Sequence, residues 1–369
     1  MAARCCSRNV CPAPNGMPNP GIPTAPRNSS SSSPYPEAAM TTDQVWRSLH
    51  VHRYSGQDEF LVDGLAPVLA GLRSSGGISQ SFFLRYWQGG HHVRVRFRVA
   101  AADADAVTAE AATKLAAYLA EFPDSTSFDV DEFRAAQPTM AALENEDVAE
   151  VQPPDTVRYA EYTPEYEKYG GRRGVALAEE YFTSSSDIVL AALATISGDS
   201  AKRLGIGFST MLRGMCAAGL STAEMAEFFR HYCLLWSPYT FEQFLGVWPQ
   251  LLQQRRCALA THVAAVLAAP ERLDDDPFHR AIGTAWRGLD DDIRAAIELA
   301  GPAATRARRE QVLLAAFLHT HNNRLGLIPE HESFLGFLGH HVLSEVAGVT
   351  AEPELLRAVR EHRASRLSN

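Results

Sequence analysis

The sequence has no apolar run that approaches the roughly 20 residues required to cross a bilayer, so we expect no membrane-spanning segment. It also has no basic excess, because 34 Lys and Arg stand against 43 Asp and Glu, for a formal net charge of −9. Proteins that bind nucleic acid directly normally carry a basic excess that neutralises phosphates. We therefore expect a protein that makes no direct contact with nucleic acid.

Cysteine is scarce as well. The six cysteines are too few for a disulfide scaffold in a chain of 369 residues, and their spacing fits no metal site. No Gly-x-Gly-x-x-Gly, P-loop, Gly-x-Ser-x-Gly or His-Glu-x-x-His motif occurs. We expect a cytoplasmic protein that uses neither a metal nor another cofactor.

The first 40 residues differ in composition from the rest. Residues 1–40 hold eight of the 21 prolines and a run of five serines, Ser29 to Ser33, without apolar periodicity. Such a segment buries too little surface to offset chain entropy, so we expect a disordered tail. It also lacks the apolar segment of a secretory signal. Ordered patterning begins near Met40. The tail is therefore either functional or the result of a start codon assigned too far upstream, with Met40 as the true start. We predict one folded domain over residues 41–369.

The folded part begins with strands and ends with helices. Two short β runs, Ser81–Trp87 and His92–Val99, flank a Gly-Gly turn and predict a hairpin. After Gly174 every segment has helical periodicity. This order predicts an α+β fold, with a small antiparallel sheet packed against a helical bundle. Further strands are expected at 45–54, 125–133 and 157–162, a loop at 134–156, and helices at 57–73, 103–122, 176–182, 187–196, 204–218, 222–235, 241–267, 278–299, 305–323, 332–346 and 354–366.

The second strand of the hairpin has one cationic face. In His92-Val-Arg-Val-Arg-Phe-Arg-Val99, the period of two places four cationic or imidazole side chains on one face and apolar side chains on the other. Arg85 lies on the partner strand, and residues 81–99 contain no acid. An unmixed row of this kind in an acidic protein indicates an anionic ligand, although a solvent face paired with distant acids is the alternative. The row consists of His92, Arg94, Arg96 and Arg98.

Two other segments combine polar groups in a way that indicates a site. Glu167-Lys-Tyr-Gly-Gly171 places a cation beside a Gly-Gly corner just before a helix, where an anion can be received. Leu318-His-Thr-His-Asn-Asn-Arg-Leu-Gly326 closes a long apolar helix. His319, Asn322 and Asn323 share one face there at i, i+3 and i+4. A frayed helix end that stops at Gly326 is the alternative.

Four motifs occur in the order and rough spacing of one known family: Phe82-Phe-Leu-Arg-Tyr86, His92-Val-Arg-Val-Arg-Phe97, Tyr166-Glu-Lys-Tyr-Gly-Gly171 and His319-Thr-His-Asn-Asn-Arg324. The chain resembles the C-terminal, glutamate-elimination domain of class I lantibiotic dehydratases, which also occurs as stand-alone thiopeptide-type bacteriocin biosynthesis proteins. The resemblance covers about residues 45–345.

The resemblance implies β-elimination of glutamate from glutamylated Ser or Thr in a ribosomally made precursor peptide. It implies catalytic roles for Arg94, Arg96 and His319, and for Lys168 at a position where the family commonly has arginine. A separate tRNA-dependent glutamylating subunit is the expected partner, besides the precursor itself. We expect substrate contacts from the surrounding polar residues Arg85, His92, Arg98, Asn322, Asn323 and Arg324.

Two departures from the family pattern leave the reaction open. Lys168 keeps the charge of an arginine but loses its bidentate fork, and an acidic residue usual in the next helix is altered near Ser184-Ser-Ser-Asp187. The alternatives are a thiopeptide pyridine synthase, which joins two dehydroalanines in a formal [4+2] cycloaddition and expels the leader peptide, and a non-catalytic subunit that binds the leader peptide.

Overall fold

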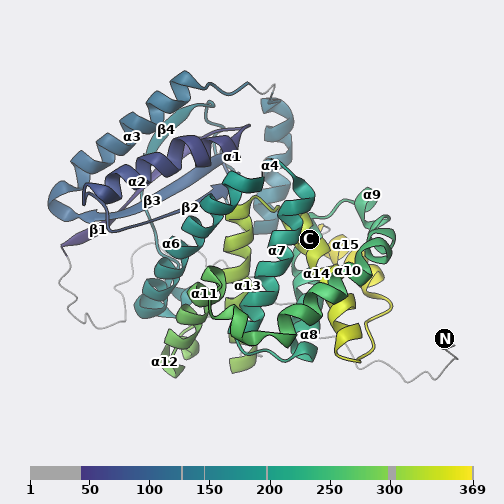
Figure 1. Cartoon of the computed structure of the whole chain (residues 1–369). Helices are drawn as coiled ribbons and strands as arrows, with labels where there is room; N and C mark the ends of the chain where they lie inside the picture. Colours follow the sequence, from purple (N-terminus) through teal and green to yellow (C-terminus); the bar gives the residue numbers. More distant parts are fainter. Residues whose placement is uncertain (1–42, 126–127, 145, 197, 298–304, 368–369) are drawn as a thin grey trace, which may run out of the picture.

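The computed structural model describes residues 43–125, 128–144, 146–196, 198–297 and 305–367. The described chain starts with a small sheet and its covering helices and continues as a helical bundle (Figure 1). The predicted α+β fold is therefore confirmed. The expected tail lies outside the described residues.

The sheet is antiparallel throughout, with the strand order β2-β3-β1-β4. The predicted hairpin joins β2 and β3 through Gly89 and Gly90, whose φ angles of 74° and 102° favour glycine. Strand β1 then pairs with β3 on one side and with β4 on the other. The strands are β1 (Gln44–His52), β2 (Gln80–Tyr86), β3 (His92–Ala100) and β4 (Thr156–Ala160).

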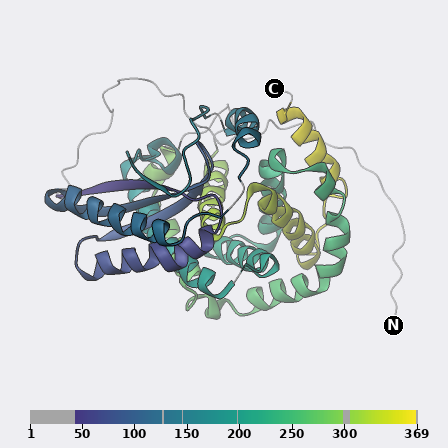
Figure 2. The same ribbon diagram turned by 90° about the horizontal axis from the view of Figure 1, so that it is seen from above.

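The two faces of the sheet meet different helices. On one face, Val93, Val95, Phe97 and Val99 are at most 1% exposed. They share an apolar core with residues of the helical segments η1 (Phe60–Leu65), α2 (Ala66–Ser74) and α3 (Ala104–Glu121). The short helix α1 (Gln57–Glu59) precedes η1, and the short helix η2 (Ala101–Asp103) precedes α3. Figure 2 shows α2 and α3 side by side on this side of the strands. The opposite face carries the cationic row and is turned toward the bundle.

The bundle is built around long helices that pack at close range. In α14, Gly336 and Gly339 lie against Cys233 and Phe229 of α8, where a larger side chain would collide. The long helices are α6 (Gly171–Ile196), α7 (Ser200–Ala217), α8 (Thr222–Trp236), α10 (Trp248–Ala268), α11 (Pro277–Gly288), α13 (Arg306–Leu325), α14 (Pro329–Val346) and α15 (Leu355–Leu367), with short turns α5 (Tyr166–Tyr169), η3 (Ser237–Tyr239), α9 (Glu242–Leu245), η4 (Pro270–Leu273) and α12 (Asp291–Ala295).

The strand predicted over 125–133 is wrong where the structure describes these residues, and the first part of the loop predicted over 134–156 is wrong too, whereas residues 146–155 form a loop as predicted. The chain forms helix α4 (Val130–Glu144) there, with Phe133, Gln137 and Ala141 buried at a spacing of four. The Asp129 side chain accepts hydrogen bonds of 2.9 Å from the first amides of this helix. A helical face and an N-terminal cap therefore outweigh the turn tendency of Pro138.

Three helix boundaries also differ from the prediction. The helices expected at 176–182 and 187–196 form one helix, α6, because its central serines are buried by partners from other elements. The helix expected at 241–267 is divided into α9 and α10, and the one expected at 278–299 into α11 and α12. Asp290 caps α12 by accepting from the amide of Ile293 at 2.9 Å. Along the described ranges, no helix combines the length and apolarity that a membrane crossing needs.

Candidate functional site

Arg94 and Arg96 lie between the sheet and the bundle, partly buried among aromatic rings. The Arg94 guanidinium carbon lies 3.4 Å from the centre of the Tyr86 ring. The Arg96 guanidinium lies 4.5 Å from the Tyr162 ring centre and 5.5 Å from that of Phe82. The row is thus not a solvent face. Within the described chain, no acid forms a salt bridge with either arginine, and the Arg96 Nε is buried without a hydrogen-bond partner.

The histidines beside this row are held neutral. The rings of His50 and His52 each lie 4.8 Å from the His92 ring. Burial lowers the pKa of His92 to about 2, that of His50 to about 3 and that of His52 to about 4, and the neighbouring arginines add to the effect. His92 accepts from Arg94 Nε at 3.2 Å and donates from Nδ1 to the Gly90 carbonyl at 2.8 Å. His92 therefore supports Arg94 without adding charge, and with 1% exposure it offers little surface to a substrate.

Lys168 approaches the same region from α5. Its ammonium donates to both oxygens of Glu165, at 3.1 and 3.2 Å. Burial lowers the pKa of Lys168, but the charges of Glu165 and Tyr169 oppose this, and the net shift is upward. Burial lowers the pKa of Arg94 and Arg96, and the negative charge of Glu165 opposes this fall. The Glu165 carboxylate therefore acts on all three cations. Lys168, Arg94 and Arg96 thus share one neighbouring carboxylate, that of Glu165.

The Gly-Gly corner after Lys168 is required by close packing. Gly170 ends α5 with a φ of 79°, and a Cβ there would collide with the Ile293 backbone. This turn lets α6 start at once at Gly171. The corner therefore fixes the end of α5, which carries Lys168, against α12.

His319 lies at the other side of the region, on α13. Its ring stacks on Trp236 with centroids 4.2 Å apart, and its Nδ1 lies 2.7 Å from a carboxylate oxygen of Glu332. The His319 side chain is 26% exposed, whereas that of Glu332 is 0% exposed. His319 therefore offers one ring edge to a ligand while the other faces a buried acid.

Glu144, at the end of α4, connects the two sides. Its carboxylate accepts from the Trp87 indole at 3.0 Å. Burial raises the pKa of the Glu144 carboxyl, and the hydrogen bonds of Trp87 and Tyr239 and the electrostatic effect of the nearby His319 side chain offset only part of this rise. Its charge also contributes, after burial, to the raised pKa of Tyr86, the ring beneath Arg94. Glu144 thus lies within electrostatic reach of both His319 and Tyr86.

Arg85 and Arg98 occupy different places from Arg94 and Arg96. The pairing of Arg85 with Val93 puts its side chain on the apolar face of the sheet, where it forms a salt bridge of 2.6 Å with Asp58. Arg85 is therefore not a member of the cationic row. Arg98 does belong to the row, at its far end, and donates to Gln80 Oε1 at 3.2 Å.

The polar residues that end α13 divide into two sets. Asn322, which is 0% exposed, donates to Glu332 Oε1 at 3.1 Å, as its shared face with His319 predicts. Asn323 instead pairs with the backbone of Arg85, accepting from its amide and donating to its carbonyl, both at 2.9 Å. Arg324, also 0% exposed, donates to the Phe83 carbonyl at 2.8 Å. The expected substrate contacts of Asn322 and Arg324 are corrected accordingly: both side chains are fully buried and hold other parts of the protein.

The sequence reasoning missed Glu332 and Glu144, and it considered Glu165 only as a possible metal-binding or acid–base carboxylate and not as the ion-pair partner of Lys168. The sequence contains a signal for Glu332, because it lies in the first turn of the helix that begins with Pro329, just after Gly326. A tight turn between two helices brings the first turn of the second helix back against the end of the first. Glu165 lies three residues before Lys168 in a helical turn, which is the spacing of an ion pair. Glu144 had no such signal, because its segment was expected to be a loop.

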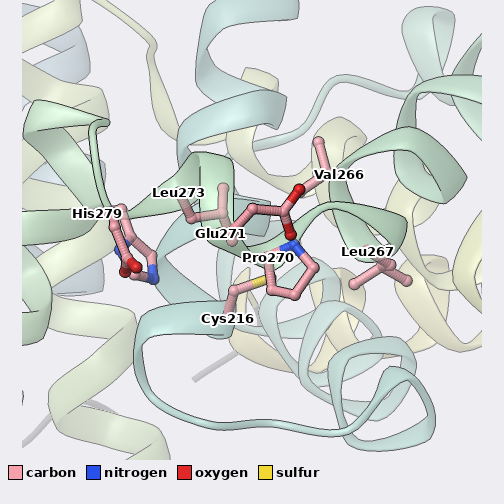
Figure 3. A pocket seen from close by; sticks show the side chains of 8 residues that line it. Cys216, Val266, Leu267, Pro270, Glu271, Leu273 and His279 are labelled. Atoms are coloured by element: carbon pink, nitrogen blue, oxygen red, sulfur yellow. The ribbon is translucent and has the colours of Figure 1, made fainter.

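The cavity drawn in Figure 3 lies elsewhere in the bundle. It has a volume of about 330 Å³ and is lined by residues of α7, α10, η4 and α11, Cys216 and His279 among them. Burial raises the pKa of the Cys216 thiol, which disfavours the reactive thiolate. Among the described residues, no three His, Cys, Asp or Glu side chains gather in a way that could hold a metal ion. The sheet–bundle junction is therefore the candidate active site.

Comparison with solved structures reveals similar folds. The pyridine synthase TbtD from thiomuracin biosynthesis matches with a TM-score of 0.66 at 22% identity, over 83% of this chain and 99% of that chain. TsrL matches with a TM-score of 0.56 at 19% identity, over 86% and 99% of the two chains. The tRNA-dependent lantibiotic dehydratase MibB from Microbispora sp. 107891 gives a TM-score of 0.46 at 20% identity, over 86% of this chain and 29% of that chain. For TbtD and TsrL, at these identities, the likeness concerns the fold alone.

The sequence itself identifies the family. No curated protein matches the chain. The family model described as "Lantibiotic biosynthesis dehydratase C-term" matches residues 46–343, which include all but the first two residues of the sheet, together with α4, α5 and α13. The chain therefore belongs to the family of lantibiotic biosynthesis dehydratase C-terminal domains, and its function lies in the maturation of ribosomally made peptides.

Proposed function

We propose that this protein removes glutamate by β-elimination from glutamylated Ser or Thr residues of a precursor peptide. The observation that carries the proposal is the pair Arg94 and Arg96, two partly buried cations that no acid of the described chain neutralises through a salt bridge. Buried charges are normally paired, so an anionic partner is expected from outside the protein. A glutamyl carboxylate provides that anion.

The proposed reaction moves one proton and breaks one bond. A base removes the Cα proton of the glutamylated residue, and the electron pair left behind forms the Cα–Cβ double bond. The Cβ–O bond breaks, and glutamate leaves with the bonding electrons as a carboxylate. His319 is the proposed base because its ring is partly exposed beside the junction. Arg94 and Arg96 stabilise the enolate charge and the departing carboxylate, which arginine can bind through two hydrogen bonds.

Lys168 has a supporting role in this proposal. Its ammonium is engaged by Glu165, so it adds less free positive charge than the two arginines. We assign to the Lys168–Glu165 pair the task of setting the field around Arg94 and Arg96. Arg98 and His92 complete the row at its two ends and hold its geometry.

The second candidate is the formal [4+2] cycloaddition that forms a pyridine. The engagement of Lys168 by Glu165 favours it, because elimination of a carboxylate benefits from every free cation at this place, whereas a cycloaddition of two dehydroalanines releases no anion. A docking subunit for the leader peptide is the non-catalytic candidate. In each case the peptide is the ligand, and for elimination a separate glutamylating protein acts first.

Two substrates supplied in parallel distinguish these reactions. The purified protein is incubated with a glutamylated precursor peptide and with a precursor that already contains dehydroalanines. We expect release of free glutamate from the first and a peptide mass lower by one water per site than the unmodified peptide. If the precursor that contains dehydroalanines loses its leader peptide and the glutamylated precursor releases no glutamate, the reaction is a cycloaddition and not an elimination. If the protein binds both peptides but converts neither, it is a non-catalytic subunit that docks the leader peptide.

A further inference from the structure

A buried acid, Glu332, contacts His319 from the first turn of α14. The turn between α13 and α14 is short because Gly326 ends α13 with a φ of 84° and Leu327 donates back to the Asn322 carbonyl at 2.9 Å. This geometry brings Glu332, thirteen residues after His319, to 2.7 Å from its Nδ1. The contact is thus a direct product of the local fold.

The Glu332 carboxylate is surrounded by donors. The Tyr232 hydroxyl and the Asn322 amide both donate to Oε1, while His319 Nδ1 lies at Oε2. Three donors on a fully buried carboxyl match the acceptor-only ionised form. A carboxylate fixed in this way accepts the Nδ1 proton of His319 and cannot donate to that nitrogen.

The ring has little freedom to turn over. Trp236 stacks on it with an interplanar angle of 24°, and the Nδ1 edge is held by a side chain with no exposed surface. The exposed part of the imidazole is therefore the edge away from Glu332, which contains Nε2. A neutral imidazole with its proton on Nδ1 has a free lone pair on Nε2.

We infer that Glu332 is the positioning residue of His319, a buried carboxylate that keeps the imidazole proton on Nδ1 and thereby presents Nε2 as the acceptor of the substrate Cα proton. The inference rests on the proposed function for the identity of that proton. When Nε2 takes the proton, the ring becomes an imidazolium, and its positive charge lies next to the Glu332 carboxylate. The proton is then released to solvent, which restores the neutral ring.

The variant Glu332→Gln tests this arrangement with little change of shape. Tyr232 and Asn322 both donate to Oε1, so the glutamine oxygen takes that position and its NH₂ group turns toward His319. An NH₂ group donates to Nδ1 and therefore moves the ring proton to Nε2. We expect the rate constant kcat to fall by about 10²–10⁴-fold, the range that general base catalysis contributes, with the upper end typical of a histidine in the wrong tautomer, and we expect little change in KM.

The tautomer is measured directly, without any substrate. The full chain is labelled with ¹⁵N-histidine, and the ring nitrogens of His319 are assigned by comparison with His319→Gln. At pH 8 we expect the wild-type proton on Nδ1 and the Glu332→Gln proton on Nε2. Glu330→Gln is the matched control, since Glu330 lies in the same helical turn but accepts from the Phe241 amide at 2.9 Å, and it should leave the His319 spectrum unchanged.

The inference would be overturned if the wild type carried a proton on Nε2, whether or not Nδ1 is also protonated, and this result does not depend on the folding of Glu332→Gln. It would also be overturned if Glu332→Gln folded and kept the proton on Nδ1. Failure of the proposed function has a different signature, because the wild type would then show the predicted tautomer but release no glutamate.

Discussion

The Arg94 guanidinium lies over the Tyr86 ring, with its central carbon 3.4 Å from the ring centre. Stacking restrains the cation without neutralising it, since the ring supplies a weak negative face and no counter-charge. Its Nε is occupied by His92, so the terminal nitrogens are the ones that can receive a ligand. Arg94 is held in place and still able to bind an anion.

Removing Arg94 or Arg96 should slow the reaction strongly. We expect Arg94→Ala and Arg96→Ala to fold and to lose about 10²–10³-fold in elimination rate, the usual loss when one stabilising group is removed at a reacting centre. The glutamylated peptide should accumulate and is followed by mass spectrometry. Arg47→Ala is the control, because Arg47 lies on β1 at the other face of the sheet and pairs with exposed Asp105. Wild-type conversion by Arg94→Ala would remove the arginines from the mechanism.

Lys168 should tolerate arginine but not a neutral residue. Lys168→Arg keeps the pair with Glu165 and restores a fork, so activity should be equal or higher. Lys168→Met leaves Glu165 without its partner and adds uncompensated negative charge beside Arg94 and Arg96, and we expect a loss of about 10- to 1,000-fold. The rates are measured as glutamate release. Full activity of Lys168→Met would show that this position has no role in the reaction.

The neutral histidines predict a dependence of stability on pH. The pKa of His52 is lowered to about 4 in the folded protein, against about 6.5 in the unfolded chain. The unfolded state therefore binds the extra proton between pH 6.5 and 4, so stability falls as the pH drops through this window. At about 1.4 kcal/mol per pKa unit, His52 alone should cost about 2 kcal/mol between pH 7 and pH 5.

Urea unfolding at the two pH values measures this effect. His50 and His92 act in the same direction, and His321, whose pKa burial lowers to about 3, adds to them. The comparison with His52→Gln isolates one group, because glutamine does not titrate. The loss from pH 7 to pH 5 should be smaller in the variant by about 2 kcal/mol. An equal loss in both proteins would mean that His52 is not held neutral.

Asn323 should matter for stability more than for substrate binding. Its side chain completes the hydrogen bonds of the Arg85 backbone, so Asn323→Ala leaves a donor and an acceptor of β2 unpaired. We expect a loss of about 1–3 kcal/mol in unfolding free energy, with KM for the peptide unchanged. Thermal unfolding and the KM for elimination are measured on the same preparation. A raised KM with unchanged stability would restore Asn323 as a substrate contact.

Local patterns explain why part of the site was predictable. The alternation in His92–Val99 has a period of two, and pleating alone then places Arg94 and Arg96 on one face. The helical spacing of His319 and Asn322 likewise predicts that the two share a face, and both contact Glu332. In each case the side-chain direction depends only on the element to which the residue belongs.

The remaining features depend on contacts between distant segments. Arg85 and Arg94 have the same charge and lie in one hairpin, but the register of the strands puts them on opposite faces. Asn323 finds its partner 238 residues away in the sequence. Glu144 belongs to a segment whose proline and polar residues favour a loop, and its helix is stabilised by burial of Phe133 and Ala141. The strand register, the distant partner of Asn323 and the packing of α4 against other elements are not specified by any single segment.

The outer edge of β2 has a further consequence. Ser186 of α6 and Asn323 and Arg324 of α13 bond its backbone at Phe83 and Arg85, where a fifth strand would otherwise pair. An edge closed by side chains cannot recruit a strand from another molecule, so this part of the protein is protected against edge-to-edge aggregation. The same bonds couple the unfolding of the sheet to that of the bundle. The region containing Arg94 and His319 is therefore expected to form only when the two halves are folded together.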